Sequence, residues 1–208
     1  MKGMLVIISG PSGSGKGTVV TRLRKERGYA LSISLTTRSP RPGERDGVDY
    51  FFTTREDFFA QRDRGELLEH ALYVGHYYGT PRRYVEEQIA QGQAVVLEIE
   101  ANGALQVKAK FPDAVMIFLM PPTWEELRSR LIHRNTEDPA TIEDRMRRAA
   151  EEIRLINQYD YMVINDTVEE ALAQIKTIVE AESLKPKRNR AEIEKWIASS
   201  LRSLPWRL

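Results

Sequence analysis

Short runs of apolar residues alternate with longer segments of helical periodicity along most of this chain. Apolar runs of four to eight residues bounded by turn signals are typical of buried strands, whereas apolar residues recurring every three or four positions indicate amphipathic helices. The strand-like runs are Met4–Ser9, Ala94–Glu98, Val115–Met120 and Tyr161–Ile164, and the helical segments are 15–27, 102–111, 123–134 and 168–184. This alternation predicts βαβ units, and therefore an α/β fold whose parallel sheet is covered by helices on both faces.

Two stretches interrupt this alternation. Residues 34–80 contain a turn rich in proline and glycine at 40–47, followed by short strand candidates around one helix, which predicts a small mixed α+β insert. Residues 124–150 carry arginines on both sides of the polar turn 135–139, which predicts two helices joined by a hinge, the arrangement of a lid. Residues 185–208 begin with basic residues and continue with an apolar stripe of helical spacing, typical of a short amphipathic helix.

Composition narrows the function classes. The 208 residues are 41% hydrophobic, enough for one sizeable core, and a net charge of +1 gives no reason to expect nucleic-acid binding. The chain has no cysteine and three histidines, which excludes disulfides and thiol catalysis and argues against a zinc site. Its longest apolar run, 114–120, is too short to cross a bilayer, and the first residues lead directly into a strand. We expect a cytoplasmic protein that binds neither nucleic acid nor membrane.

The strongest local motif lies between the first predicted strand and the first predicted helix. It consists of Gly10, Pro11, Ser12, Gly13, Ser14, Gly15, Lys16, Gly17 and Thr18. Glycines let successive backbone N–H groups turn inward around phosphate oxygens, the helix N-terminus adds its positive dipole end, and the lysine reaches the β and γ phosphates. These residues are therefore predicted to bind ATP rather than to form a plain glycine-rich turn.

This loop departs from the common phosphate-loop pattern at one position. Gly17 stands directly after the lysine, where a Ser or Thr usually binds magnesium, and Thr18 follows one residue later. Adenylate kinases have the same Gly-Lys-Gly-Thr ending, and the Asn-Lys-X-Asp motif expected of a GTPase is absent from the chain. The departure favours a monophosphate kinase over a GTPase and leaves Thr18 as a candidate metal ligand.

A second anion site is predicted in the turn-rich part of the insert. Arg38 and Arg41 lie three residues apart beside a rigid Pro-Gly turn, with Tyr50 nearby. Arginine forks bind a phosphate dianion bidentately, and a tyrosine hydroxyl donates a further hydrogen bond. Taken alone, such a loop is more often a solvated basic turn, but beside a phosphate loop it is a candidate acceptor site.

The segment 34–50, with Glu69 and the run 75–80, resembles the GMP-binding region of guanylate kinases, and the similarity extends from Met4 to about Leu184. The resemblance implies that Arg38, Arg41, Tyr50 and Tyr78 bind the GMP phosphate and that Ser34, Glu69 and Thr80 read the guanine. Guanine presents two parallel donors, N1–H and the 2-amino group, to one carboxylate, whereas adenine has an acceptor at N1. Glu69 therefore suits GMP and not AMP, although on its own it would be taken for a surface residue.

Two acids, Glu98 and Glu100, follow the apolar run 94–97, at the end of a predicted parallel strand where open α/β sheets bind ligands. Alternation places both side chains on the same side of the strand. Guanylate kinases usually have Asp-X-Asp here, and the resemblance implies that Glu98 holds Mg²⁺ through water and that Glu100 contacts the guanine or the ribose. The alternative is a pair of solvated or helix-capping acids.

Arginines of the predicted lid have an electrostatic role, because phosphoryl transfer develops negative charge on oxygens between donor and acceptor. The resemblance singles out Arg130, Arg134 and Arg145 as catalytic residues beside Lys16. Arg130 and Arg134 are four residues apart and hence on one helix face. The remaining lid arginines, Arg128, Arg147 and Arg148, are predicted to be solvated surface. Asn165, in a segment that resembles the border of the family's adenine site, is a candidate ATP contact.

The resemblance implies a P-loop core in which a five-stranded parallel sheet is flanked by helices. The core comprises 1–33, 81–123 and 151–184, the GMP-binding insert 34–80, the lid 124–150, and the basic tail 185–208. The implied reaction is transfer of the γ-phosphoryl group of ATP to GMP, giving ADP and GDP, with Mg²⁺ bound to ATP. A further candidate acceptor is dGMP.

Two other functions stay open at this point. Guanylate-kinase domains of membrane-associated scaffolds resemble the fold as non-catalytic interaction modules, but their phosphate loop is eroded, whereas Lys16 and its glycines are present here. A kinase of the same fold acting on a ribose phosphate would leave the base readers Ser34, Glu69 and Thr80 idle. The chain is expected to be a monomer or a homodimer, with its tail either packed on a neighbouring subunit or solvated.

Overall fold

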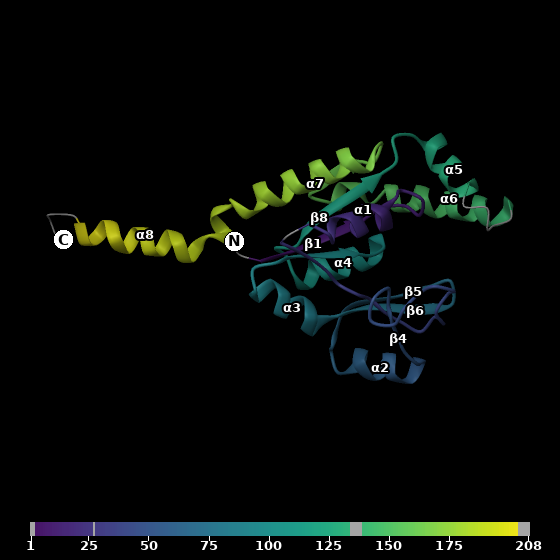
Figure 1. The fold of residues 1–208 in the computed structure, drawn as a ribbon, viewed down its shortest axis with the longest axis horizontal. Coiled ribbons are helices and arrows are strands. Elements are labelled where there is room, and N and C mark those ends of the chain that lie inside the picture. Colours follow the sequence, from purple (N-terminus) through teal and green to yellow (C-terminus); the bar gives the residue numbers. More distant parts are fainter. Residues whose placement is uncertain (1–2, 27, 134–138, 204–208) are drawn as a thin grey trace.

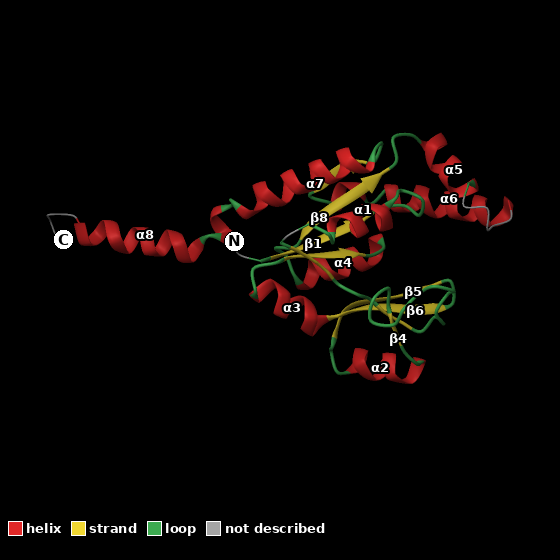
Figure 2. Cartoon of the chain, viewed as in Figure 1, coloured by secondary structure: helices red, strands yellow, loops and turns green. Residues whose placement is uncertain are grey.

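The computed structural model describes residues 3–26, 28–133 and 139–203. Its centre is a parallel sheet in the order β2-β7-β1-β8-β9 (Figures 1 and 2). The strands are β2 (Tyr29–Leu31), β7 (Ala94–Glu98), β1 (Met4–Ser9), β8 (Val115–Met120) and β9 (Tyr161–Ile164). This confirms the predicted α/β class and the five-stranded parallel sheet.

Helices cover both faces of this sheet, and β1 shows why its strands are apolar throughout. Val6 and Ile8 point into one core cluster, which α1 (Lys16–Leu23) and α7 (Val168–Ser183) cover. Leu5 and Ile7 point into the opposite cluster, which α3 (Arg82–Ala90) and α4 (Ala101–Lys110) cover. A strand buried on both faces reads as a continuous apolar run rather than as an alternation.

The insert forms a second sheet of four strands, in the order β4-β3-β6-β5. Its strands are β3 (Leu35–Thr36), β4 (Phe51–Phe52), β5 (Leu67–Tyr73) and β6 (His76–Pro81). The pairs β3–β6 and β5–β6 are antiparallel and β3–β4 is parallel, so the sheet is mixed. Helix α2 (Arg55–Asp63) places the fully buried Phe58 in a small core with Leu35 and Leu67, and Tyr77 packs against it.

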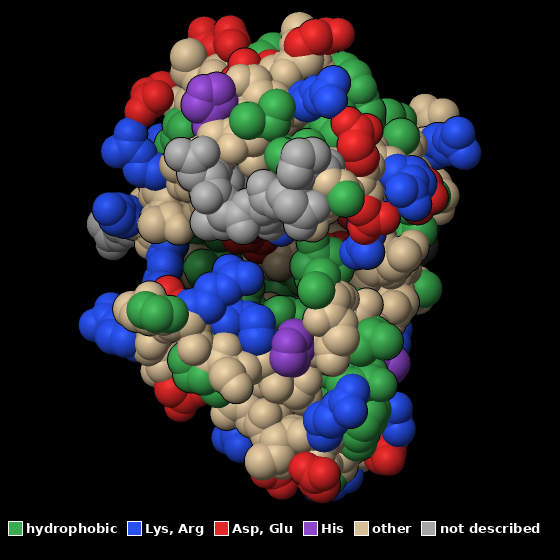
Figure 3. Space-filling model, turned by 90° about the vertical axis from the view of Figure 1, so that its right-hand side faces the viewer, with side chains coloured by type: hydrophobic (Ala, Val, Ile, Leu, Met, Phe, Trp, Pro, Cys, Tyr) green, Lys and Arg blue, Asp and Glu red, His purple; other side chains and the backbone are tan. Residues whose placement is uncertain are grey.

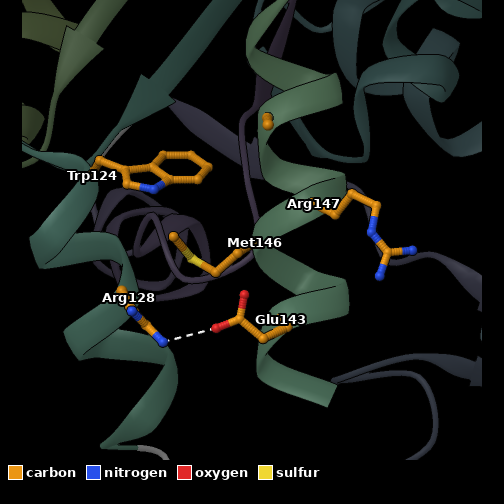
Figure 4. Close-up of a pocket in the computed structure, with 6 residues that line it drawn as sticks. Trp124, Arg128, Glu143, Met146 and Arg147 are labelled. Carbon is orange, nitrogen blue, oxygen red and sulfur yellow. Dashed lines mark hydrogen bonds and ion pairs between the residues drawn. The ribbon is translucent and has the colours of Figure 1, made fainter. Parts of the chain in front are cut away.

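The two helices of the predicted lid, α5 (Trp124–Ile132) and α6 (Pro139–Ile153), pack against each other on the phosphate-loop side of the molecule. Leu127 and Leu131 of α5 bury themselves against Met146 and Ala149 of α6. Figure 4 shows Met146 facing Trp124 across the helix pair, with an ion pair of 2.8 Å between Arg128 and Glu143 beside them. A single turn of 3₁₀ helix, η1 (Ile156–Gln158), leads from α6 into β9.

The C-terminal part of the chain leaves the body of the protein as a helix, α8 (Arg190–Ser203), which projects beyond the core (Figure 1). The short η2 (Pro186–Arg188) anchors its base. There Arg188 donates to the carbonyl oxygen of Asp113 at 2.7 Å and pairs with the buried Glu182 at 3.4 Å. Among the described residues, no helix is long and apolar enough to cross a membrane.

Candidate functional site

The phosphate loop connects the end of β1 to the start of α1. Gly15 precedes the helix with φ of 89°, a left-handed conformation that favours glycine. Lys16 Nζ donates hydrogen bonds to the carbonyl oxygens of Gly10 at 2.6 Å and Pro11 at 3.1 Å, which keeps the ammonium group over the loop. The predicted strand–loop–helix setting for phosphate binding is thus present.

Asn165 holds the phosphate loop through a hydrogen bond to its backbone. Its side chain is 4% exposed, and Nδ2 donates to the carbonyl oxygen of Ser14 at 2.7 Å. A Cβ on Gly15 would lie 2.3 Å from that same nitrogen, so only glycine fits over the asparagine. The backbone oxygen of Asn165 also accepts a hydrogen bond of 3.1 Å from Arg130 Nη2, which places this lid arginine beside the loop. Asn165 therefore supports the phosphate loop; a direct contact with ATP stays a prediction.

A cleft with a volume of about 370 Å³ lies between the phosphate loop and the insert. Figure 3 shows Lys and Arg side chains gathered at the edge of this hollow. From the predicted site residues, the cleft walls include Ser12, Gly13, Gly15, Lys16 and Gly17 of the loop, Ser34, Arg38, Arg41, Tyr50, Glu69 and Tyr78 of the insert, Glu98 and Glu100 of the core, and Arg145 of the lid. The fold thus brings predicted donor, acceptor and lid residues to one cavity.

Arg38 lies at the insert side of this cleft and is held by Glu44. Its Nη2 donates to both carboxylate oxygens, at 2.8 and 2.9 Å, and the backbone N–H of Arg41 donates to the same glutamate. Burial opposes ionisation of Glu44, but these hydrogen bonds outweigh it and lower the pKa of this carboxyl. The sequence analysis did not single out Glu44, because an acid six residues from an arginine in a loop has no periodicity that indicates a pair.

Two tyrosines stand around the Arg38 guanidinium. The guanidinium carbon lies 5.3 Å from the ring centroid of Tyr50, and the rings of Tyr50 and Tyr78 meet edge to face at 5.9 Å. Burial, followed by the nearby Glu98 carboxylate, raises the pKa of Tyr50 and keeps its hydroxyl a donor. Arginine and phenol donors thus converge where the sequence predicted an acceptor phosphate.

Glu69 is a buried acid in the wall of the cleft, with 3% of its surface exposed. Thr80 donates its hydroxyl to Glu69 Oε1 at 2.7 Å. On the other side, a Cβ on Gly103 would lie 2.9 Å from Glu69 Oε2, so the glycine leaves room for the carboxylate. Burial raises the pKa of Glu69 to about 7, even though the Thr80 hydrogen bond and Lys110 act in the opposite direction. Thr80 therefore orients Glu69 in this structure.

The strand-end acids border the phosphate loop. Glu98 is an exposed residue at the end of β7, paired in register with Ile8 of β1, and its carboxylate oxygens lie 3.7 and 3.9 Å from where a Cβ of Gly17 would stand. The cleft walls desolvate Glu100 and raise its pKa, while Lys16 and Arg148 counteract the shift. Thr18 is exposed on α1. Within the described residues, no group of three acids or histidines is placed to hold a metal by itself.

Of the three lid arginines predicted to be catalytic, the structure describes two. Arg145 on α6 donates from Nη1 to Ser12 Oγ at 3.4 Å, and Arg130 on α5 lies beside the loop as stated above. Arg134 lies outside the described residues. Catalytic roles for all three stay predictions.

Sequence reasoning missed three residues that lie next to the cleft. Tyr73 of β5 lines it, and Arg148 and Glu152 of α6 line an adjoining cavity together with Tyr73. Arg148 is exposed, as predicted, and its guanidinium carbon in addition lies 5.9 Å from the Tyr73 ring centroid. Burial raises the pKa of Glu152 to about 7. The signal that would have found Arg148 is its position three residues after Arg145, on the same face of one helix.

Comparisons with known proteins agree with this geometry. The family model described as guanylate kinase matches residues 2–182. A guanylate kinase of Oceanobacillus iheyensis is 50% identical over 96% of this chain and 98% of its own, and one of Halalkalibacterium halodurans is 54% identical over 90% and 92%. The crystal structure of guanylate kinase from Anaplasma phagocytophilum superposes with a TM-score of 0.74 at 34% identity, covering 89% of each chain. The chain belongs to the guanylate kinase family.

Proposed function

We propose that this chain transfers the γ-phosphoryl group of ATP to GMP, giving ADP and GDP, in the cleft between the phosphate loop and the insert. The observation that carries the proposal is the buried Glu69, held by Thr80 and accommodated by Gly103 in the same cavity as Lys16. Family membership at about 50% identity over most of the chain supports the reaction.

Base selection is assigned to Glu69. Its ionised carboxylate accepts from guanine N1–H and the 2-amino group at once, which offsets the cost of keeping an acid in a site that is 3% exposed. With adenine, one Glu69 oxygen would face the N1 lone pair and stay without a hydrogen bond. A site built to accept a hydrogen bond rejects an analogue that lacks the donor by a factor on the order of 10⁴. Ser34, which lines the same cleft, supplies a further hydroxyl to the guanine, and Glu100 contacts the guanine or ribose.

The acceptor phosphate binds at Arg38, Arg41, Tyr50 and Tyr78. Arg38 already donates from Nη2 to both carboxylate oxygens of Glu44, and a phosphate dianion presents a similar pair of oxygens to this guanidinium. When GMP binds, its phosphate therefore replaces Glu44 as the acceptor of the Arg38 hydrogen bonds. dGMP, which keeps both the phosphate and the guanine, is expected to bind as well.

The ATP phosphates bind along residues 10–18. Lys16 and the lid residues Arg130, Arg134 and Arg145 stabilise the negative charge that develops on the phosphoryl oxygens during transfer. Arg145 already reaches Ser12 of the loop, so closure of α6 brings its guanidinium over the transferred group. No protein nucleophile is required, because the acceptor phosphate oxygen is itself ionised. The residues of the chain bind, orient and shield the reactants from water.

Mg²⁺ fits this cleft as a partner of ATP. Glu98 lies beside Gly17 and offers carboxylate oxygens, the ligand class that Mg²⁺ prefers. With glycine at position 17 there is no hydroxyl directly after the lysine, so Glu98 would hold the hydrated ion through water, and Thr18 is the other candidate. When bound, the ion neutralises phosphate charge.

We assign the parts of the chain as predicted, with the core in 1–33, 81–123 and 151–184, the insert in 34–80, the lid in 124–150 and the tail in 185–208. The chain acts in the cytoplasm as a monomer or homodimer, and its partners are ATP and GMP, with no nucleic acid or membrane.

A coupled assay of ADP formation from ATP and Mg²⁺ tests the proposal, with GMP, dGMP, AMP, CMP, UMP and ribose 5-phosphate as acceptors. Turnover with GMP and dGMP alone is expected. Turnover with a ribose phosphate would point to a sugar-phosphate kinase instead. ATP binding without turnover on any acceptor would overturn the kinase assignment in favour of a binding module.

A further inference from the structure

Arg148 touches the insert from the lid. It lies on α6 one helical turn after Arg145, with its guanidinium carbon 5.9 Å from the ring centroid of Tyr73 on β5. Asp144, on the preceding turn, forms an ion pair of 2.9 Å with Arg148 Nη2 and orients the guanidinium. Because Arg145 reaches Ser12 at the same time, α6 contacts the phosphate loop through one arginine and the insert through the other.

From Tyr73 the contacts continue to the proposed acceptor subsite. The rings of Tyr73 and Tyr78 meet edge to face at 6.3 Å, and Tyr78 meets Tyr50 at 5.9 Å. Arg38 stacks on Tyr50. A chain of aromatic contacts therefore runs from Arg148 in the lid to the group proposed to hold the GMP phosphate.

Arg148 also borders a second cavity. Together with Tyr73 and Arg145 it lines a cavity of about 480 Å³ that adjoins the cleft, and Glu100 and Glu152 line the same cavity. Glu152 is desolvated there, and burial raises its pKa to about 7. Arg148 itself keeps 50% of its side chain exposed, so it meets Tyr73 at the rim of this cavity.

We infer that Arg148 is a positioning residue whose contact with Tyr73 couples occupation of the acceptor subsite to the placement of Arg145 on the phosphate loop. This inference rests on the proposed function. A phosphate bound at Arg38 and Tyr78 fixes the Tyr73 ring, and Tyr73 then holds α6 with Arg145 toward Ser12. Coupling between two binding sites is reciprocal. A nucleotide at the phosphate loop therefore increases the affinity for GMP, and GMP increases the affinity for the nucleotide by the same factor.

Calorimetry on the full chain measures this coupling as the ratio of the GMP dissociation constants without and with a saturating non-hydrolysable ATP analogue and Mg²⁺. The wild type is expected to show a ratio of about fivefold or more. Arg148→Gln is expected to bring the ratio close to one while the binary GMP constant stays within about twofold, because the guanidinium does not line the acceptor subsite itself. In turnover, the same variant raises KM for GMP at saturating ATP and lowers kcat.

Matched variants separate the contact from general effects of charge or folding. Arg147→Gln removes a neighbouring arginine that also pairs with Asp144 but points away from the helix pair (Figure 4), and it should keep the wild-type ratio. Tyr73→Phe keeps the ring and the coupling, whereas Tyr73→Leu loses the coupling and the double variant Tyr73→Leu/Arg148→Gln loses no more. A wild-type ratio near one, or an unchanged ratio in Arg148→Gln, overturns the inference. Failure of GMP to bind at all would instead overturn the proposed function.

Discussion

At the scale of single residues, the proposed base reader, Glu69, lies in an unusual environment. Glu69 is buried, receives a hydroxyl hydrogen bond from Thr80, and approaches a helix at the one residue without a side chain, Gly103. The sequence indicated Glu69 only through resemblance, because a glutamate in a strand-like run is usually exposed. Its burial, and the pairing of Glu44 with Arg38, arise from contacts between segments or loop geometry that no periodicity encodes.

The environment of Glu69 predicts a pH dependence of stability. Because its pKa is raised to about 7 in the folded state, the folded protein keeps this proton at pH values where the unfolded chain, with an ordinary glutamate, has lost it. The free energy of unfolding should therefore fall as pH rises from about 5 to 7 and level off above, with a contribution from Glu69 on the order of 2 kcal/mol. Urea unfolding at pH 5.5 and 7.5 measures it.

Glu69→Gln is the variant that isolates this contribution. Glutamine stays neutral throughout, so the variant should lose less stability than the wild type over this pH range and should be the more stable of the two at pH 7.5. Glu152 has a pKa raised in the same direction, so Glu152→Gln removes a separate part of the slope. Equal slopes in wild type and Glu69→Gln would contradict the assigned environment.

At the scale of secondary-structure elements, the sequence predicted best where burial is complete. The bounds of β1, β7 and β8 follow the apolar runs, because these strands are largely buried in the central sheet. The edge strand β9 also follows its apolar run, although Met162 and Ile164 are exposed. The pattern missed β2, an edge strand of three residues, and α3, in which Val85 alone is fully buried. Short or weakly buried elements depend on their neighbours more than on their own periodicity.

The junction of the phosphate loop with α1 predicts a sharp difference between two glycines. Gly15 and Gly28 both have positive φ, 89° and 93°, but a Cβ on Gly15 would stand 2.3 Å from Asn165 Nδ2, whereas a Cβ on Gly28 would meet nothing within 4 Å. Gly28→Ala is expected to cost about 1 kcal/mol of stability through backbone strain alone and to leave KM for ATP unchanged.

Gly15→Ala carries the same strain and must also displace Asn165 from the loop. Its kcat/KM for ATP should fall about a hundredfold, as expected when phosphate donors are misplaced by an ångström. Steady-state kinetics and thermal unfolding of both variants make the comparison. If both alanines affected ATP use alike, Asn165 would have no role in shaping the loop.

At the scale of the whole molecule, the residues proposed to bind ATP and GMP are grouped around one cleft, whereas α8 projects away from it. Ile193, Trp196 and Ile197 lie three and four residues apart on α8 and are 39%, 77% and 51% exposed. The helix begins only after the anchor formed by Arg188, which donates to the carbonyl oxygen of Asp113. The sequence predicted this amphipathic helix, and its projection from the body shows that its apolar stripe does not contribute to the core.

Truncation distinguishes the projecting helix from its anchor. A chain ending at residue 189 should keep the melting temperature and the turnover of the full chain, because α8 projects away from the core and the cleft. Arg188→Met in the full chain should instead lower the free energy of unfolding by about 2 kcal/mol, since it removes a cation beside the buried Glu182. Differential scanning calorimetry compares both with wild type. A large loss in the truncated chain alone would show that α8 stabilises the fold.

The most direct test of the central claim, that Glu69 selects guanine in the proposed cleft, is the ratio of kcat/KM for GMP to that for IMP. IMP keeps N1–H and lacks the 2-amino group, so it removes one of the two donors that the carboxylate accepts. Wild type should prefer GMP by about a hundredfold, and Glu69→Gln should bring the ratio close to one, because its amide offers one acceptor and opposes the second donor. A Glu69→Gln enzyme that kept the wild-type ratio would contradict the account.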